Sequence, residues 1–228
     1  MSEVEYQKQI KGNFDYSDDA GTLIAYDAIM DYWNSQVVKG DGNMYLTIDV
    51  ARKGKDKTVF RVWNGFLVVA RLAMDKSLVT EVVEKARAIQ ANFKITNSNT
   101  VADEDGVGGG VVDMLGCRGF VNNSRAKPEL IGDDYIVPNY ENLKTQCTMH
   151  MARLITERKV AEICKSNEVM QLVSEEMEQV VLKDLDKDSK VRLVPKEEIK
   201  KNIGRSPDDV DSIMMRYIFE LETPLWFS

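Results

Sequence analysis

Residues that commonly act as catalytic nucleophiles, bases or zinc ligands are scarce in this chain of 228 residues, which has three cysteines and one histidine. Cys117, Cys147 and Cys164 do not form a CxxC pair. The sequence therefore predicts no zinc site, and the few cysteines fit a reducing compartment. The one histidine, His150, lies in the middle of a predicted helix. We expect it on the helix surface rather than in a catalytic triad, because a histidine base needs a nucleophile placed beside it.

The sequence also lacks long apolar runs and the common nucleotide-binding motifs. It has no run of about 18 apolar residues that would span a membrane, and its polar N-terminus does not predict a signal peptide. The P-loop pattern GxxxxGK[ST] is absent, although residues 52–57 form a basic turn. The glycine-rich stretch Gly106–Gly110 does not complete the dinucleotide pattern GxGxxG, because residue 111 is valine. We therefore predict neither a membrane protein, nor a P-loop ATPase, nor a dinucleotide enzyme.

The charge balance is acidic. Thirty lysines and arginines stand against 37 aspartates and glutamates, which gives a formal net charge of −7. A DNA-binding protein usually has a basic balance. A local basic face can coexist with acidic elements elsewhere, and carboxylates that are neutralised by metal ions still count in the formal total. The net charge therefore does not exclude a nucleic-acid substrate.

Hydrophobic periodicity predicts an α/β domain with a mixed sheet. Three antiparallel strands come first, with Asn64-Gly65 as the hairpin turn between the second and the third. Further strands alternate with helices, so we expect parallel additions to the sheet and helices on both of its faces. The predicted strands span residues 45–50, 58–63, 66–72, 100–102, about 120–122, and 191–194.

The helices are predicted from apolar residues at helical spacing and from their capping residues. Asp75 or Ser77 is expected to cap one of them, and Ser206 to cap the last. We expect an irregular connection at 124–137 and solvated, charged stretches at 183–190 and 196–205. The predicted helices span residues 23–33, 75–93, 111–115, 138–155, 168–182 and 206–221.

Acids occupy the ends of two predicted strands. Asp49 ends the first strand, and Asp103 follows the strand at 100–102, just before the glycine-rich turn. An acid in this place is costly as scaffolding, and sites in α/β proteins form beyond the carboxyl ends of strands. Asp208 lies in the first turn of the last helix, where an acid can also be present for the helix dipole alone. We expect the three aspartates to converge.

Neighbouring acids leave alternatives open at two of the three positions. Glu104 or Asp105 could take the place of Asp103. Asp209 or Asp211 could take the place of Asp208, and of these Asp211 shares a helix face with Asp208 because it is three residues away.

Carboxylates without histidine or thiolate ligands favour hard cations such as Mg²⁺ or Mn²⁺. Two such ions ~3.5–4 Å apart activate water and stabilise the leaving oxygen in phosphodiester hydrolysis. Basic residues beside Asp49 would then contact DNA phosphates. These residues are Arg52, Lys53, Lys55 and Lys57.

Three stretches in this order resemble the acidic motifs of a known family, the C-terminal nuclease domain of the large terminase subunit of tailed double-stranded DNA phages. The first runs from Asp49 through the basic turn to Asp56 and Thr58-Val. The second is Asp103-Glu-Asp-Gly-Val-Gly, and the third is Ser206-Pro-Asp-Asp-Val-Asp-Ser, in which Ser212 replaces the usual alanine. The stretch 140–146 resembles the helix start between the second and third motifs.

The resemblance implies a ribonuclease H-like fold and a metal-dependent endonuclease that cuts concatemeric viral DNA during genome packaging. It implies two divalent cations, Mg²⁺ or Mn²⁺, with Asp49, Asp103 and Asp208 as metal ligands and catalytic residues. Asp56 matches an auxiliary acid, and Asp211 matches the second acid of the third motif. Residues 1–42 resemble the junction after the family's ATPase domain, and residues 43–228 match the nuclease domain itself.

The implied partners are double-stranded DNA, the ATPase domain, the portal and a small terminase subunit. The implied location is the host cytoplasm, with a transient stay at the procapsid portal and no membrane. Three other hypotheses compete with this one: a resolvase or transposase-type nuclease of the same fold, a sugar-kinase or actin-like ATPase, and a non-catalytic module that binds DNA or docks a motor.

Overall fold

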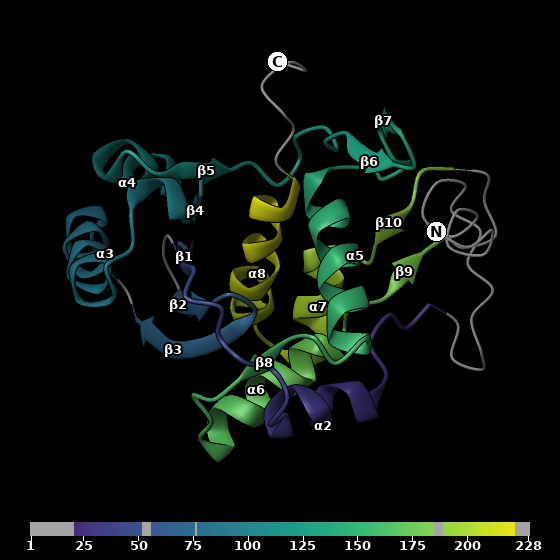
Figure 1. Cartoon of the computed structure of the whole chain (residues 1–228), viewed down its shortest axis with the longest axis horizontal. Helices are drawn as coiled ribbons and strands as arrows, with labels where there is room; N and C mark the ends of the chain where they lie inside the picture. The colour runs from purple at the N-terminus through teal and green to yellow at the C-terminus, as the bar shows by residue number, and fades with distance from the viewer. Residues whose placement is uncertain (1–20, 52–55, 76, 185–188, 222–228) are drawn as a thin grey trace.

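A six-stranded mixed sheet forms the centre of the computed structural model, which describes residues 21–51, 56–75, 77–184 and 189–221 (Figure 1). The strand order is β5-β4-β1-β2-β3-β8, in which β1, β2 and β3 are antiparallel and β4, β5 and β8 pair in parallel. The predicted fold class is confirmed. The strands are β1 (Met44–Asp49), β2 (Thr58–Asn64), β3 (Leu67–Met74), β4 (Thr100–Asp103), β5 (Arg118–Phe120) and β8 (Ala161–Glu162).

Helices lie on both faces of the sheet. In Figure 1, α3 (Val79–Phe93) and α4 (Gly108–Leu115) lie on the left. In the chain, α3 follows β3 and α4 follows β4. Apart from the short 3₁₀ helix η1 (Asn97–Asn99) just before β4, the other described helices belong to the opposite side, where α8 and the 3₁₀ helix η2 contact the central strands. They are α2 (Tyr26–Asn34), α5 (Leu143–Thr156), α6 (Asn167–Met177), α7 (Lys196–Ile203), α8 (Asp208–Met214) and η2 (Met215–Leu221).

Alternating side chains divide the core into two layers. On β1, Leu46 and Ile48 pack with the buried residues of α3 and α4. On β2, Phe60 joins the same layer, whereas Trp63 packs on the other side with α5 and η2. This period of two is what a strand with both faces covered requires. The residues between the apolar ones of β1 therefore face α8.

The described part of the N-terminal segment packs on the second layer. Ile29 and Trp33 of α2 are fully buried, and the Trp33 indole N–H donates to Ser174 Oγ of α6 at 3.1 Å. A division of the chain at residue 42 stays a prediction.

The start of α3 differs from the predicted start. The helix begins at Val79, and the Glu81 carboxylate accepts a hydrogen bond from the Leu78 N–H at 2.7 Å. Neither Asp75 nor Ser77 is its N-cap, so that prediction is wrong. An acid inside the first turn satisfies the free N–H in place of a side chain before the helix.

The start of α5 is also later than the sequence pattern indicates. This helix begins at Leu143 rather than at Pro138, because Asn142 is the N-cap and its side chain accepts from the Thr145 N–H at 2.9 Å. The stretch expected to be irregular contains a hairpin of β6 (Glu129–Ile131) and β7 (Asp134–Ile136). In a second hairpin, β9 (Leu182–Lys183) pairs with β10 (Arg192–Leu193), and the expected solvated stretch after it contains α7.

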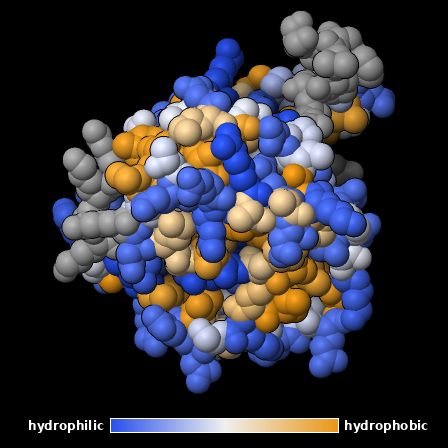
Figure 2. Space-filling model, turned by 90° about the vertical axis from the view of Figure 1, so that its left-hand side faces the viewer, coloured by the Kyte–Doolittle hydropathy of each residue, from blue (hydrophilic) through white to orange (hydrophobic). Residues whose placement is uncertain are grey.

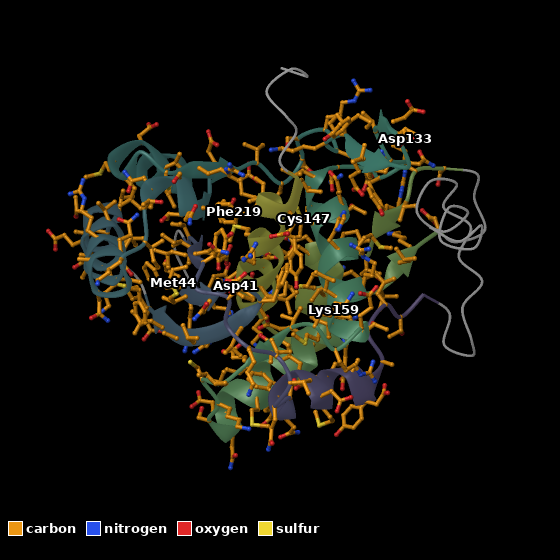
Figure 3. All side chains as sticks on the ribbon, viewed as in Figure 1. Asp41, Met44, Asp133, Cys147, Lys159 and Phe219 are labelled. Carbon is orange, nitrogen blue, oxygen red and sulfur yellow. The ribbon has the colours of Figure 1, made fainter. Side chains whose placement is uncertain are left out.

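His150 joins the first hairpin to α5. Its Nε2 lies 2.9 Å from Glu129 Oε1 on β6. This contact gives His150 a structural role. Figure 3 shows the same side of the molecule, with Asp133 of the hairpin tip at the periphery and Cys147 in the interior.

The surface is of mixed polarity on the side of α3 and α4. Figure 2 shows this face, where hydrophilic and hydrophobic areas are interspersed. Glu81, Glu84 and Arg87 are among the exposed residues of α3. Within the described part of the chain, no helix is long and apolar enough to cross a membrane.

The central strand gives a test of the core. Ile48 is 0% exposed and lies between β2 and β4, so Ile48→Ala should lower the free energy of unfolding by about 2–5 kcal/mol. Ile163, which is 57% exposed, is the matched control, and Ile163→Ala should change it by less than about 0.5 kcal/mol. Urea unfolding measures both. Similar losses in the two variants would contradict the position assigned to β1.

Candidate active site

The parallel pairing of β1 with β4 places the ends of these strands at the same edge of the sheet. Ile48 pairs with Ala102, so the next residues, Asp49 and Asp103, leave the two strands side by side. Ile48 and Ala102 both pack under α3 and α4. The alternation of side chains therefore turns both aspartates to the face that α8 covers. Asp49 is only 5% exposed, so its carboxyl lies inside the protein.

Helix α8 brings two further carboxylates to this place. Asp208 and Asp211 are both buried and, being three residues apart, share one helix face. The Lys57 backbone N–H donates to Asp208 Oδ2 at 2.9 Å, which ties the chain that enters β2 to the first turn of α8. Pro207 is the N-cap of α8, so the predicted Ser206 cap is wrong.

The charges of these four acids act on one another. Burial raises the pKa of Asp49 well above its usual value, and the neighbouring carboxylates raise it further. Burial also raises the pKa of Asp103 to about 6. The structure thus brings together the three aspartates that the sequence singled out, and with them Asp211, which the sequence analysis named as an alternative to Asp208 and as the second acid of the third motif. We name them the acid cluster: Asp49, Asp103, Asp208 and Asp211.

Two lysines from other helices neutralise part of the acid cluster. Lys196 of α7 places its Nζ 2.8 Å from Asp211 Oδ2 and 3.7 Å from Asp208 Oδ1. Lys144 of α5 places its Nζ 2.6 Å from Asp211 Oδ1. Burial opposes the ionisation of Asp211, but the two ammonium groups outweigh it and lower the pKa of Asp211 to about 2.

Neither lysine was identified as a site residue from the sequence. Lys144 lies within the stretch 140–146, whose resemblance to the family pointed only to a helix start. Lys196 follows a proline in a charged segment without a motif, and no local signal marks it. Both reach the acid cluster through tertiary packing alone.

Asp209 lies between Asp208 and Asp211 in sequence, but its carboxylate points the other way. Its Oδ1 accepts hydrogen bonds from Arg61 Nη2 at 2.8 Å and from Arg71 Nε at 2.7 Å. Its Oδ2 accepts from Arg71 Nη2 at 2.8 Å. Burial opposes the ionisation of Asp209, but the two guanidinium groups outweigh it and hold its pKa below the usual value. Asp209 is therefore separate from the acid cluster.

Glu104 and Asp105, the alternatives to Asp103, lie at the rim. The Asn122 side-chain amide donates to Asp103 Oδ1 at 3.2 Å and to Asp105 Oδ2 at 2.8 Å. Glu104 is exposed, and its side chain lies close to Gly119. Asn122 thus orients Asp103, although the sequence placed it only near the end of a strand.

The basic turn after β1 is described only at its end. Asp56, the predicted auxiliary acid, pairs with Lys200 of α7, 3.3 Å from its Nζ. The Nζ of Lys57 lies 3.8 Å from Asp75 and is half exposed. The other three residues predicted to contact DNA lie outside the described ranges: Arg52, Lys53 and Lys55.

The donor chemistry of the acid cluster fits a hard divalent cation, because the negatively charged groups that converge there are all carboxylates and no histidine or thiolate is among them. If all are ionised, four carboxylates face two ammonium groups, and the neighbouring carboxylates add to the burial that raises the pKa of Asp49. In the described ranges, no three His, Cys, Asp or Glu side chains are arranged to hold a metal ion. The ammonium of Lys196 contacts both Asp208 and Asp211.

A pocket of about 400 Å³ opens beside the acid cluster. Lys144, Lys196 and Asp211 border it, and Leu193 and Val210 add apolar surface. The acids therefore lie next to a space that admits a ligand much larger than an ion.

A glycine allows the chain to turn tightly below Asp103. In the first turn of α4, a Cβ on Gly108 would collide with the carbonyl oxygen of Asp103. A Cβ on Gly109 would lie 3.5 Å from the Glu104 carbonyl oxygen, which is an ordinary contact. Only the first of these two glycines is required by the close approach of the backbone.

No protein-family model and no curated protein matches this sequence. Solved structures do match. The nuclease domain of the large terminase subunit gp2 of bacterial virus Sf6 superposes with a TM-score of 0.71 and 15% identity, over 89% of this chain and 99% of that one. A variant of it with calcium gives a TM-score of 0.72 and 15% identity, over 89% and 100% of the two chains.

A third match is more distant. The large terminase nuclease of thermophilic phage G20c with bound magnesium has a TM-score of 0.55 and 13% identity, over 88% of this chain and 98% of that one. At such low identity, the likeness shows the fold. This chain has the ribonuclease H-like fold of large terminase nuclease domains, as the sequence motifs predicted.

The two glycines of α4 provide a matched test of the turn below Asp103. Gly108→Ala should lower the free energy of unfolding by about 1–3 kcal/mol, because the backbone of Asp103 must move. Gly109→Ala should leave it unchanged or raise it by up to about 1 kcal/mol, because alanine is the better helix former. Thermal unfolding of the two variants distinguishes these effects, and equal stability would show that the turn is not tight.

Proposed function

We propose that this chain is a metal-dependent endonuclease that cuts concatemeric double-stranded viral DNA during genome packaging. The observation that supports it best is the convergence of four carboxylates beyond the ends of β1 and β4, in the fold of large terminase nuclease domains. Two strand ends and a helix face, distant in sequence, supply them. Structural needs alone do not explain why four acids are buried together, because each loses hydration and repels the others.

The proposed mechanism is two-metal-ion hydrolysis of a phosphodiester. Two Mg²⁺ or Mn²⁺ ions, when bound, would supply an activated water and neutralise charge at the leaving oxygen. Asp49, Asp103 and Asp208 would hold them, and Asp211 is a fourth ligand within reach. Ionised carboxylates are required, so cation binding would pull the pKa of Asp49 and of Asp103 down from their raised values.

The lysines have a second role in this proposal. Lys196 would give up its contacts with Asp208 and Asp211 when a cation binds between them. Its ammonium and that of Lys144 border the neighbouring pocket, where they would contact DNA phosphates. Lys57 would do the same from the start of β2. We propose phosphate contacts for the rest of the basic turn as well: Arg52, Lys53 and Lys55.

The wider context follows from the resemblance. We propose that residues 43–228 form the nuclease domain and that residues 1–42 connect it to an ATPase domain. Its partners would be double-stranded DNA, the portal and a small terminase subunit. It would act in the host cytoplasm, at the procapsid portal.

Cleavage of supercoiled plasmid tests the proposal. We expect the wild type to nick and linearise plasmid with Mn²⁺ or Mg²⁺ and to be inactive in EDTA. Asp49→Ala should lose activity by more than the ~10–100-fold that follows loss of an outer-shell partner. Asp113→Ala, in which an exposed acid of α4 is removed, should cleave like the wild type.

Mn²⁺ binding decides the case in which the wild type does not cleave. Binding that is lost in Asp49→Ala would support the metal site and show that DNA cleavage needs further parts of the machine. No binding by the wild type would overturn the proposal and favour a non-catalytic docking module.

Removing Lys196 should strengthen metal binding. A unit charge about 4 Å from another contributes ~1 kcal/mol even in water, and the metal carries two charges. Lys196→Ala should therefore lower the Kd for Mn²⁺ by about tenfold or more in calorimetry. Lys159→Ala is the control, because Lys159 pairs only with Glu157 among the ion pairs of the described chain and lies beyond the end of α5 (Figure 3). Weaker binding in Lys196→Ala would contradict the competition between ammonium and metal.

A further inference from the structure

Two arginines hold the first turn of α8 against the sheet. Arg71 of β3 binds both carboxylate oxygens of Asp209, at 2.7 and 2.8 Å. Arg61 of β2 binds Asp209 Oδ1 at 2.8 Å and also donates from Nη1 to the Asp209 backbone oxygen at 2.9 Å. We name Arg61, Arg71 and Asp209 the arginine clamp. It fixes both the side chain and the backbone of one residue, so the helix turn has little freedom to rotate.

The clamp is built on β2 and β3, and β2 lies next to β1, the strand that carries Asp49. Arg61 pairs with Thr47 of β1 on one side and with Arg71 of β3 on the other. Thr47 and Asp49 are two residues apart on β1 and therefore point to the same face. The Arg61 side chain and the Asp49 carboxyl therefore lie on one face of the sheet. Arg61 is opposite Thr47, which is two residues before Asp49 on β1.

The clamp is itself supported from behind. Arg61 is 0% exposed, and its Nε donates to Glu162 Oε2 of β8 at 3.2 Å. The same oxygen accepts from the Tyr32 hydroxyl of α2 at 2.7 Å. Ser212 of α8 also contacts Arg61 Nη1. Every nitrogen of this guanidinium therefore has a partner, and its orientation is fixed.

Stability alone is a poor reason for this arrangement. A buried ion pair recovers little more than its desolvation cost, and apolar residues of the same volume are often as stable. What the clamp adds is geometry, because bidentate guanidinium–carboxylate pairs have one preferred orientation. Asp208 and Asp211 flank the clamped residue, so their position relative to Asp49 depends on it.

We infer that Arg61 and Arg71 are positioning residues for the metal site, which act through Asp209 to set the distance between α8 and the strand ends. The inference rests on the proposed function. It assigns Asp209 to the clamp rather than to the metal. Arg61 and Arg71 touch neither metal nor DNA in this scheme, and their effect on the site is transmitted by the first turn of α8.

Charge and geometry predict opposite effects when Arg71 is replaced. Loss of a positive charge near the acid cluster would, by electrostatics alone, strengthen binding of a divalent cation. Loss of orientation would weaken it. Removing a partner that orients a metal ligand typically lowers metal affinity ~10–100-fold. The direction of the change in metal affinity therefore separates a positioning role from an electrostatic one. If Arg71 had a purely structural role, its replacement would leave the metal affinity of the folded protein unchanged.

The experiment measures Mn²⁺ affinity by calorimetry on variants that show a cooperative thermal transition. We expect Arg71→Gln to bind Mn²⁺ ~10–100-fold more weakly than the wild type. Arg71→Lys keeps the charge but loses the bidentate fork, and we expect it to bind as weakly as Arg71→Gln. Arg158→Gln is the matched control, because Arg158 also binds two aspartates, on the distant α2, and its loss should leave Mn²⁺ affinity unchanged. Arg71 is preferred to Arg61 because its side chain is 12% exposed and its replacement disturbs the core less.

Each outcome is decisive. Weaker binding by both Arg71 variants, with unchanged binding by Arg158→Gln, supports the inference. Wild-type affinity or tighter binding in Arg71→Gln overturns it and leaves the proposed nuclease function standing. Wild-type affinity in Arg71→Lys alone shows that the bidentate contact with Asp209 is not needed for metal binding, and it also overturns the inference. Absence of Mn²⁺ binding by the wild type overturns the proposed function, and the inference with it.

Discussion

Mutual repulsion of carboxylates is the constraint on which this structure depends. Four aspartates come together in a largely buried place, where each loses hydration and raises the cost of ionising the others. The chain offsets part of this with two ammonium groups, one from α5 and one from α7. The offset is incomplete, so the cluster keeps an excess of negative charge.

Holding repelling groups together requires a rigid frame, and the sheet provides it. The parallel pairing of β1 with β4 fixes Asp49 and Asp103. It places both side chains at the same edge of the sheet and on the same face. The acids of α8 have no such ladder. Their helix is short and has a proline as its N-cap, so its orientation depends on side-chain contacts. The arginine clamp supplies these contacts from β2 and β3 of the same sheet, so one sheet positions both halves of the site.

The strand-borne half of the site was predictable from the sequence, whereas the helix-borne half was predictable only in part. Asp49 and Asp103 follow apolar strands, and local pattern marks such ends. At the start of α8, three acids compete, and the choice among them depends on Arg61, which lies in a strand far away in sequence. Nothing near Arg61 or Lys196 indicates their partners, because these contacts arise only when separate elements pack. The helix starts were misplaced for a related reason, since Glu81 and Asn142 cap their helices where the pattern favoured earlier residues.

The charge balance of the clamp differs from that of the acid cluster, and this sets how the protein responds to ionic strength. Arg61 and Arg71 face Asp209 and Glu162, so two positive charges meet two negative ones in a layer that is shielded from solvent. The acid cluster has an excess of negative charge next to an open pocket, where dissolved ions can approach. Salt screens exposed excess charge far more than buried, balanced pairs. Monovalent salt therefore eases the repulsion among the aspartates, while the frame that holds them in place remains unchanged.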